Sequence, residues 1–595
     1  MIYHIDSIEA LMTLPVERLQ NGDTAILSRF PGQTGLAGGS DDGRPGGSSG
    51  AGGVVIRLQW QPECTLSPNG GTVIAPESAG SVGGAKLEGA EIGEVEFEGA
   101  GDCGGELEGV EVGEAEFEGA RDGEGELEGT EGGVGGAVAG LAGPADRPSG
   151  QASATLPPGR WRLLHGGVGD FRYFGIFGPE RPADHALEVM VNDPEIKRIE
   201  AYTDLRFTKR HKFQRSGLEL DFHHCTITTD GIEPAKHNDP FGAVMHFCGR
   251  VTEVRQRLVL TEPLRELEDI FEVADSSAFQ VYDWWVVSVN PLAGKEEKEI
   301  DKLLMVTEII DATHVRFNYK IGWELATGRV VTYQRVEPVR HVHVRNMVFW
   351  GNDGGEERGV QPLALEYAVE CDVSGLKAYH TYWPVIMRRH NTHYVTERCT
   401  LVNPVEVVVG GTGYLTQQIH CLYGKVRDCT TSNARHLNDF TGSAYSMVEN
   451  CHGDGDYHGA FVTHGQFEHD LTYVGNSGLI SFANSGPTWG ESARRIAVKR
   501  HSGCWMIARA KVSDLTLEDV HITKTQSYPQ CGTMLINADG VQIRGCTADK
   551  LIFTQRSARS RRPNIVQDCH FTDGIDITRQ GAQTVTAKIK VRDEL

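Results

Sequence analysis

The sequence lacks the features of a membrane or secreted protein. No apolar run approaches the length of about 18 residues that a membrane-spanning helix needs. The amino terminus, MIYHIDSIEALMTLPVERL, has neither a basic n-region nor a sustained apolar core. We therefore expect no signal peptide and no membrane insertion. The final RDEL resembles an endoplasmic reticulum retention signal, but it has no meaning without an import signal.

Other absences exclude several kinds of chemistry. The 13 cysteines form no CxxC pair, which argues against a zinc ribbon, and their odd number in a long chain argues against a dense disulfide framework. No HExxH or P-loop motif is present. The net charge is −24, without the basic face that nucleic acid requires. We predict no metal, no cofactor and no nucleic-acid partner.

Most of the negative charge lies in one repeated segment. Residues 84–136 contain 17 Asp and Glu against two basic residues, which is −15 of the net charge of −24. The phrase LEGAEIGEVEFEGAGDCGGE, from Leu87, is followed after 20 residues by LEGVEVGEAEFEGARDGEGE, from Leu107. Neighbouring glutamates repel one another and little can be buried. We predict a flexible or weakly ordered Gly/Glu-rich insertion at 84–149, with an acidic metal-binding repeat as the alternative.

From about Phe171 the chain consists of short β-rich phrases. Phrases such as VSDLTLEDVHI and DGVQIRGCTA alternate apolar and polar residues and place a small or polar residue at a corner. Cys429 and Cys451 occupy equivalent points 22 residues apart, and Cys546 and Cys569 are 23 apart. A repeat of this size, without a helical pattern, predicts a solenoid whose coils bury their inward side chains against one another. These cysteines are therefore predicted to be structural.

The first 180 residues carry a resemblance to a known family. The phrases GDTAILSRFPGQTGLAGG, GGTVIAP, GRWRLL and DFRYFGIFG resemble the amino-terminal region of tailed-phage tail spikes and related proteins of the pectate-lyase-like superfamily. In that family a Gly-rich strand module leads through a WFGA-G type segment into a right-handed parallel β-helix. The corresponding residues here are Tyr173, Phe174, Gly175 and Gly178, and Ile176 and Phe177 stand where small residues are usual.

The resemblance covers most of the chain apart from Lys86 to Arg147, and it implies a domain organisation. We expect an all-β fold, with a small strand-rich module at 1–168 that carries the insertion, followed by a right-handed parallel β-helix at 169–581. Long excursions at about 250–337 are expected to form side loops, and residues 582–595 a terminal strand or tail.

The resemblance also implies a function. Its members are homotrimeric virion or prophage appendages that engage bacterial surface polysaccharide and attach to a phage tail or baseplate protein through the amino-terminal module. Such a protein is made in the host cytoplasm and acts at the bacterial surface. Because these β-helices host lyases, hydrolases, epimerases and non-catalytic binders, the chemistry has to be argued from residues.

A homotrimer is also expected from an aromatic phrase. DWWVV, at 283–287, would form an apolar patch too large for a monomer if it were exposed. Closed three-fold assembly would cover such a patch.

The candidate catalytic residues gather in one part of the solenoid. The phrase NARHLNDF supplies Arg435, His436 and Asp439. One coil of 22 residues forward from His436 reaches His458, and 25 residues forward from Asp439, allowing for a bulged corner, reaches His464. In this register all five side chains share one outer face over two coils.

Two kinds of glycan chemistry suit these residues. A polysaccharide lyase needs a cation to offset the uronate carboxylate and a base for the C5 proton, tasks that suit Arg435 and a histidine near neutrality. A hydrolase needs two carboxylates about 5–10 Å apart, which Asp439 with Asp454 or Asp456 could supply. Asp454 and Asp456 could also be simple turn formers. A histidine at a corner often only hydrogen-bonds a neighbouring turn, so a structural role stays open.

A second cluster, YHTYWPVIMRRHNTH, is aromatic and basic together. Trp383, Arg388 and Arg389 could form a platform on which a sugar stacks. The same stretch could instead be a side loop packed against a neighbouring subunit.

The leading hypothesis is a tail-spike depolymerase that cuts a bacterial capsule, exopolysaccharide or lipopolysaccharide. The alternatives are a trimeric adhesin that binds glycan without turnover and a purely structural virion fibre. The depolymerase and the adhesin can be distinguished by the arrangement of Arg435, His436, Asp439 and His464. One solvent-accessible groove favours the enzyme, whereas burial of two or more of them inside the coil favours the binder.

The insertion generates the first testable prediction. Deletion of Lys86 to Arg147 should leave the melting transition of the β-helix nearly unchanged, because the repeat has few large apolar residues and Gly-rich ends. Differential scanning calorimetry of the deleted and full-length chains tests this. A large loss of thermal stability, or of soluble protein, would show that the segment belongs to the core.

Overall fold

The computed structural model describes residues 2–5, 11, 14, 19–27, 56–61, 73–74, 160–232, 242–292, 298–351, 360–455, 459–483, 492–525, 530–555, 560–579 and 584–587. The acidic repeat lies outside these residues, so its predicted flexibility stays a prediction. His458 and Asp456 also lie outside them.

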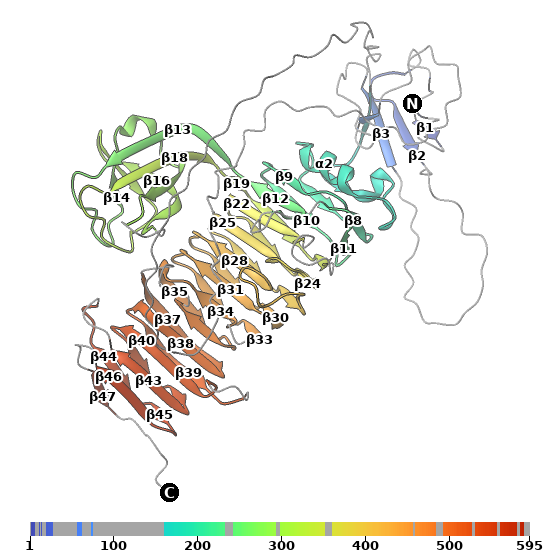
Figure 1. Cartoon of the computed structure of the whole chain (residues 1–595). Helices are drawn as coiled ribbons and strands as arrows, with labels where there is room; N and C mark the ends of the chain where they lie inside the picture. The colour runs from blue at the N-terminus through green and yellow to red at the C-terminus, as the bar shows by residue number, and fades with distance from the viewer. Residues whose placement is uncertain are drawn as a thin grey trace, which may run out of the picture.

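The main body is a parallel β-helix, the fold class that the sequence predicts (Figure 1). Each turn of the chain adds one strand to each of two parallel sheets and, over most of its length, to a third. Each strand pairs with the equivalent strand of the next turn. Val373 pairs with Thr396 and Lys425 with Met447, so one turn takes 23 or 22 residues at these points. This is the spacing that the cysteines predict.

The strands of each sheet follow the chain in order. The first sheet contains β6 (Val168–Asp170), β7 (Arg198–Glu200), β10 (Leu218–Asp221), β20 (Val342–Arg345), β23 (Asp372–Ser374), β26 (Val395–Glu397), β29 (Lys425–Arg427), β32 (Met447–Glu449), β35 (Gln466–Val474), β37 (Ser492–Gly503), β39 (Thr516–Ile522), β41 (Gln542–Arg544), β44 (Asn564–Gln567) and β47 (Thr584–Ala587). The second contains β8 (Leu205–Phe207), β11 (Thr226–Thr229), β21 (Val348–Trp350), β24 (Lys377–Tyr379), β27 (Thr400–Val402), β30 (Thr430–Ala434) and β33 (His452–Gly455), and further along β42 (Thr547–Ala548) and β45 (His570–Phe571). The third contains β9 (His211–Phe213), β12 (Met245–Cys248), β22 (Leu363–Val369), β25 (Ile386–Thr392), β28 (Tyr414–Ile419), β31 (His436–Thr441), β34 (Phe461–Thr463), β36 (Ile480–Phe482), β38 (Trp505–Ser513), β40 (Thr533–Asp539), β43 (Lys550–Gln555) and β46 (Ile575–Arg579), and β19 (Val339–Arg340) also pairs with β22.

The corner between the first and second sheets repeats at every turn from β20 to β44. One residue there adopts a left-handed backbone with φ between 49° and 67°, and the next side chain is buried. The left-handed residues are Asn346, Gly375, Arg398, Asp428, Asn450, Gly475, Arg500, Asp519, Gly545 and Asp568. Cys429, Cys451, Cys546 and Cys569 are among the buried residues that follow, and all four are free thiols. The prediction that they are structural is confirmed.

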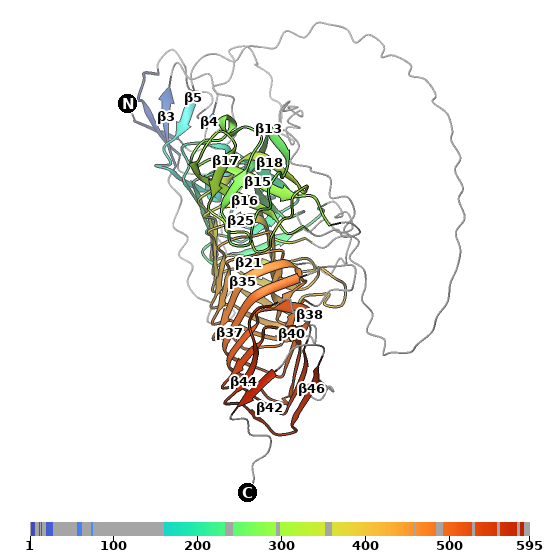
Figure 2. The ribbon, with the colours of Figure 1, turned by 90° about the vertical axis from the view of Figure 1, so that its left-hand side faces the viewer.

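Between β12 and β19 the chain leaves the coil and forms an antiparallel side sheet, with strand order β13-β18-β15-β16-β17-β14 (Figures 1 and 2). Its strands are β13 (Arg250–Val259), β14 (Ile270–Glu272), β15 (Trp284–Val289), β16 (Asp301–Ile309), β17 (His314–Phe317) and β18 (Val330–Glu337), with a 3-10 helix, η3, at Ser276–Ala278. The core of the side sheet includes Leu422 and Ala444 of the coil, so the two parts pack on one another.

The side sheet corrects one expectation. Trp284 and Trp285 of the DWWVV phrase are 4% and 0% exposed, because β15 is a central strand of the side sheet. The exposed aromatic patch predicted from this phrase is therefore wrong. The homotrimer loses that support and stays a prediction from the family resemblance alone.

A small sheet and a helix precede the coil. In the small sheet β1 (Ile2–Ile5) pairs in parallel with β2 (Thr24–Leu27), and β3 (Ile56–Gln61), β5 (Arg160–Leu163) and β4 (Val73–Ile74) follow in antiparallel order. The 3-10 helix η2 (Phe171–Phe174) begins at Asp170, whose carboxylate accepts from Arg172 N. The helix α2 (Asp184–Asn192) buries its apolar face in the core of the coil and covers its first turn.

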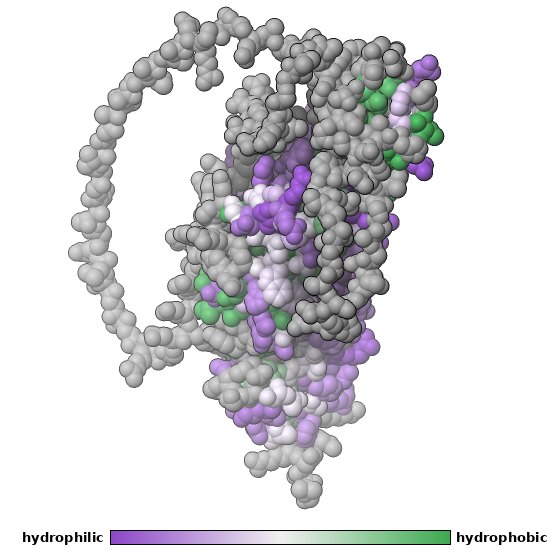
Figure 3. Space-filling view, turned by 90° about the vertical axis from the view of Figure 1, so that its right-hand side faces the viewer, coloured by the Kyte–Doolittle hydropathy of each residue, from purple (hydrophilic) through white to green (hydrophobic). Residues whose placement is uncertain are grey.

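One face of the coil is largely polar. The face shown in Figure 3 is mainly hydrophilic along the described part of the coil, with small hydrophobic areas. No helix among the described residues is long and apolar enough to cross a membrane.

The corners generate a prediction about stability. Asn450 has φ of 52°, which Asn tolerates and a β-branched residue does not. Asn450→Val should therefore lower the free energy of unfolding by about 1–2 kcal/mol. Asn450→Gly loses the same hydrogen bond to Asp428 but permits this φ, so it is the matched control. Equilibrium denaturation measures both, and equal losses in the two variants would contradict the backbone argument.

Candidate functional site

The outer face of the third sheet brings His464 and Asp439 into contact. Asp439 lies on β31, and His464 directly follows β34 on the next turn. The distance from His464 Nε2 to Asp439 Oδ2 is 3.0 Å. The 25-residue step from the sequence thus joins two residues that do touch.

The histidine is the part of this pair that reaches solvent. Asp439 faces outward, because its neighbour Phe440 packs in the core of the coil. The Asp439 side chain is nevertheless 0% exposed, and its Oδ1 accepts from Thr441 Oγ1 at 3.2 Å. The His464 side chain is 20% exposed. A buried carboxylate therefore orients a partly exposed imidazole.

Glu468 fixes the turn that carries His464. Glu468 Oε1 accepts from His464 N at 3.2 Å and Oε2 accepts from Gly465 N at 2.9 Å. Oε1 also accepts from Gly442 N of the preceding turn at 3.1 Å. Gly442 and Gly465 adopt φ of 55° and 85°, which glycine adopts without strain. The Glu468 carboxylate therefore ties the loops of two successive coils together.

The electrostatics of the site favour a charged His464–Asp439 pair. Burial alone would lower the pKa of His464, but the charge and hydrogen bond of Asp439, with the charge of Glu468, raise it above its ordinary value. Although burial opposes ionisation of Asp439, His464 holds the pKa of that carboxyl below its ordinary value. Burial raises the pKa of Glu468.

Arg435 and His436 lie beside the pair, but they differ in access. Arg435 is partly exposed, and its Nη1 donates to Val407 O at 2.9 Å and to Val408 O. His436 is 3% exposed, with Nδ1 bonded to the carbonyl of Gly459. Burial, reinforced by the charge of Arg435, lowers the pKa of His436 to about 3. His436 is therefore neutral at physiological pH and covered.

The four predicted residues thus gather at one place without forming one open groove. Arg435 and His464 are partly exposed, whereas His436 and Asp439 are buried. Where His458 and Asp456 lie is not described, and Asp454 is an exposed residue whose Oδ1 accepts from Asn433 N at 3.2 Å.

The structure contradicts the predicted sugar-stacking platform. Arg388 is 0% exposed and points into the coil, where it donates to Cys371 O at 3.0 Å and to Thr396 Oγ1 at 3.1 Å. Trp383 is 2% exposed. Arg389 is partly exposed and forms an ion pair with buried Glu366. The platform fails because Trp383 and Arg388 are buried, and the partly exposed Arg389 is held by the Glu366 carboxylate.

Two residues of the site were not predicted from the sequence. Glu468 follows His464 by four residues, and its proximity alone was a signal. Lys302, on β16 of the side sheet, donates from Nζ to the carbonyl of Gly442. The sequence carries no signal for Lys302, because the contact joins residues 140 positions apart.

One group of side chains has ligand atoms close enough for a metal. His246, Cys248 and Glu366 place one such atom each within 4.8 Å of one another. Arg389 Nε donates to Glu366 Oε1 at 2.6 Å, however. Against burial, His246 and Arg389 lower the pKa of Glu366 to about 2. A guanidinium already balances this carboxylate, so the group is best explained as a buried ion-pair network.

Comparisons with known proteins add to this picture. No family model and no curated protein matches the sequence. Among solved structures, the chain is similar to the tailspike of Acinetobacter baumannii bacteriophage AP22 in complex with an A. baumannii capsular saccharide, with a TM-score of 0.48, 12% identity, and coverage of 71% of this chain and 73% of that one. It is also similar to the tailspike of Pseudomonas phage LKA1, with a TM-score of 0.46, 11% identity, and coverage of 68% and 70%. A third similar structure is the family 28 exopolygalacturonase of Yersinia enterocolitica, with a TM-score of 0.37, 11% identity, and coverage of 71% and 77%.

These structures are of the kind that the sequence resemblance names. The fold of this chain itself rests on its own strand pairing.

The pair generates a prediction about titration. Asp439→Asn removes the anion that favours protonated His464, so the pKa of His464 should fall. Diethyl pyrocarbonate reacts with neutral imidazole, and mass spectrometry of the modified peptides gives the pH at which His464 becomes reactive. That pH should be lower in the variant than in the wild type. The reaction of exposed His452, bonded to Ser477 Oγ, should not change. An unchanged His464 profile would show that Asp439 does not control its protonation.

Proposed function

We propose that the chain is a phage tail spike that binds a bacterial surface polysaccharide and cleaves it by β-elimination, with His464 as the base. The observation that carries this proposal is the His464–Asp439 pair at 3.0 Å, with the imidazole partly exposed on the outer face of the coil. The buried carboxylate selects the tautomer and orientation of the ring, as a base that removes a proton from carbon requires.

The surroundings of the pair favour elimination over hydrolysis. A hydrolase needs two carboxyl groups that reach the scissile bond. Asp439 is fully buried and bonded to His464 and Thr441. Glu468 is buried and bonded to backbone N–H groups. A lyase needs one base and one cation for the uronate carboxylate, and partly exposed His464 and Arg435 suit these two tasks.

The remaining parts of the proposal rest on the family resemblance. A tail spike would be a homotrimer in the virion, attached to the phage tail or baseplate through the amino-terminal module. It would act at the bacterial cell surface.

A second candidate is a glycan-binding protein without turnover. The burial of His436 and Asp439 favours it, because two of the four predicted residues cannot touch substrate in this conformation. Both candidates predict binding to the host polysaccharide, and they differ in cleavage.

Incubation with capsular and exopolysaccharides of candidate hosts separates the two. Ultraviolet absorbance of unsaturated uronate ends reports elimination, and release of reducing ends reports cleavage of either kind. We expect both signals to rise together on the right glycan. Reducing ends without the absorbance would indicate a hydrolase, and binding without either signal would indicate the adhesin.

The variants of the site give the sharpest prediction. His464→Ala should lower the rate by about two to four orders of magnitude, the usual contribution of a positioned base, with little change in affinity or melting temperature. Arg435→Ala should weaken affinity and turnover together, because a counter-charge acts on both the bound substrate and the transition state.

The pH dependence follows from the same role. A base must be neutral, so the wild-type rate should increase as pH rises through the raised pKa of His464. A His464→Ala variant that keeps full activity, or that loses activity only because it unfolds, would remove His464 from the mechanism.

A further inference from the structure

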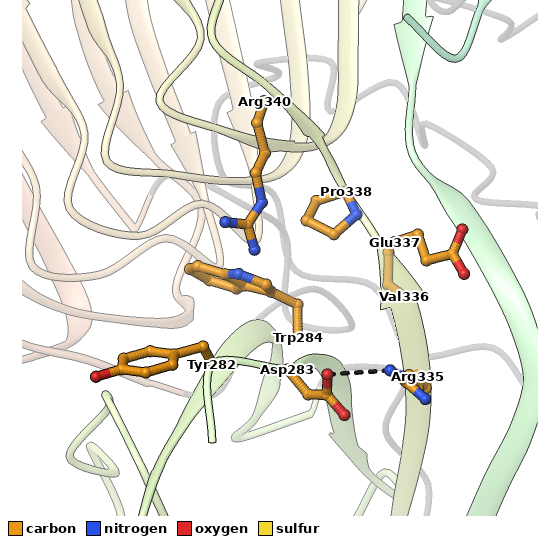
Figure 4. Close-up of a pocket in the computed structure, with 8 residues that line it drawn as sticks. All are labelled: Tyr282, Asp283, Trp284, Arg335, Val336, Glu337, Pro338 and Arg340. Carbon is orange, nitrogen blue, oxygen red and sulfur yellow. Dashed lines mark hydrogen bonds and ion pairs between the residues drawn. The ribbon is translucent and has the colours of Figure 1, made fainter. Parts of the chain in front are cut away.

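A pocket of about 250 Å³ lies where the side sheet meets the coil (Figure 4). It is formed by the beginning of β15, the end of β18 and the start of β19. The lining residues are Tyr282, Asp283, Trp284, Arg335, Val336, Glu337, Pro338 and Arg340. None of them belongs to the site around His464.

The charges of the pocket leave one cation without a carboxylate. Arg335 Nη2 donates to Asp283 Oδ1 at 3.0 Å, and Glu337 forms an ion pair with Arg250 at 2.6 Å. No hydrogen bond or ion pair of the Arg340 guanidinium is present among the described residues. Its Cζ lies 5.6 Å from the centroid of the Trp284 ring, toward which the side chain points (Figure 4). Arg340 is therefore the one cation of the pocket lining that no carboxylate of the described residues pairs with.

Two buried polar atoms at the pocket also lack partners within the described chain. Trp284 is 4% exposed, and its indole N–H makes no hydrogen bond there. Asp283 Oδ2 is likewise buried and without a donor. Buried polar groups in folded proteins nearly always have partners. A bound molecule that offers an acceptor to Trp284 and a donor to Asp283 would satisfy both.

The rim of the pocket carries an exposed aromatic ring. Tyr282 is 71% exposed, and it adopts a left-handed backbone with φ of 74°. This conformation costs a tyrosine about 1–3 kcal/mol, and such strain gathers at functional sites. The N–H of Tyr282 donates to Val306 O at 2.9 Å, which holds the strained residue on the side sheet. An exposed ring of this kind offers an apolar face to the C–H face of a sugar.

From these features we infer that the pocket binds a single carboxylate-bearing sugar, such as a hexuronate residue of an acidic polysaccharide. Its carboxylate pairs with Arg340 and accepts from Trp284 Nε1, a hydroxyl donates to Asp283 Oδ2, and the ring stacks on Tyr282. The inference rests on the proposed polysaccharide binding, and it adds a second recognition point on the side sheet.

The size and charge of the pocket decide between ligands. Ligand pockets usually measure about 300–1,000 Å³, so a volume of about 250 Å³ suits one ring rather than an oligosaccharide. The one unpaired cation, Arg340, matches the single charge of a carboxylate. A doubly charged phosphate would bring a second negative charge for which the pocket has no unpaired cation.

Binding of sodium D-glucuronate, with D-glucose as the neutral match, tests the inference on the full chain. Saturation-transfer NMR measures both weak affinities directly. We expect the wild type to prefer glucuronate. Arg340→Gln should weaken glucuronate binding roughly ten- to hundred-fold, as the loss of a charged hydrogen bond does, and leave glucose unchanged. Arg544→Gln makes the same charge change at an exposed arginine on β41 and is the control.

A second variant keeps the test valid if Arg340→Gln fails to fold. Tyr282→Ala removes an exposed ring and should weaken glucuronate and glucose alike. Equal affinity of the wild type for the two sugars, or wild-type glucuronate binding by both variants, would overturn the inference. His464→Ala, measured in parallel, separates this result from the proposed cleavage. Loss of cleavage with intact glucuronate binding would bear only on the proposed catalytic site on the coil. Loss of glucuronate binding with intact cleavage would bear only on the pocket.

Discussion

The left-handed residue at the corner between the first and second sheets is the constraint on which the coil depends. From β20 to β44 it bends the chain at each corner of this kind, and the parallel ladder continues through the corner, as in the bond from Arg398 N to Arg427 O at 3.1 Å. The residue after the corner lies buried inside the bend, as Cys429, Met347 and His501 all do. Where this residue is cysteine, its thiol also donates to the carbonyl two residues earlier, at 3.2 Å in Cys429 and 3.3 Å in Cys451. The repeated cysteines therefore follow from backbone geometry rather than from redox or metal chemistry.

The interior of the coil is not uniformly apolar. Arg388 lies fully buried with its guanidinium 4.3 Å from the Tyr394 ring centroid, and no carboxylate is bonded to it among the described residues. Tyr394 OH donates to Gln418 Oε1 at 2.5 Å, and Gln418 Nε2 donates to Asn438 Oδ1 at 2.5 Å. Burying these polar groups costs desolvation energy. It also favours a single register between successive turns, because a shift of one turn against the next would leave the buried groups without partners. The ladder ends at Asn438, next to Asp439, so the backbone that carries the carboxylate is held from inside as well as outside.

Sequence periodicity was sufficient to predict the fold and one contact of the site. Strand alternation and cysteine spacing predict the coil, and counting one turn from Asp439 to His464 gives the 3.0 Å pair, because both depend on the local repeat. The direction of side chains at bulged corners does not follow from counting. Arg388 lies inside the coil, although its charge predicts the outside. Lys302 contacts the loop of the site, and the pocket near Arg340 forms, where the side sheet packs on the coil. No local sequence pattern predicts this long-range contact.

The side sheet reaches the site through a chain of buried polar contacts. Asp301 on β16 lies 2.9 Å from His390 Nε2, and against burial the nearby histidines hold the pKa of its carboxyl far below the ordinary value. Its neighbour Lys302 donates to the Gly442 carbonyl, while Glu468 accepts from the N–H of that same glycine. Burial lowers the pKa of Lys302 to about 8, so its ammonium group loses its proton more readily than that of an exposed lysine. Because Glu468 also holds His464, the position of the imidazole depends on how the side sheet is seated. The side sheet that carries the proposed sugar pocket thus also supports the turn that carries His464. The positions of the two proposed sites therefore depend on the same contacts between side sheet and coil.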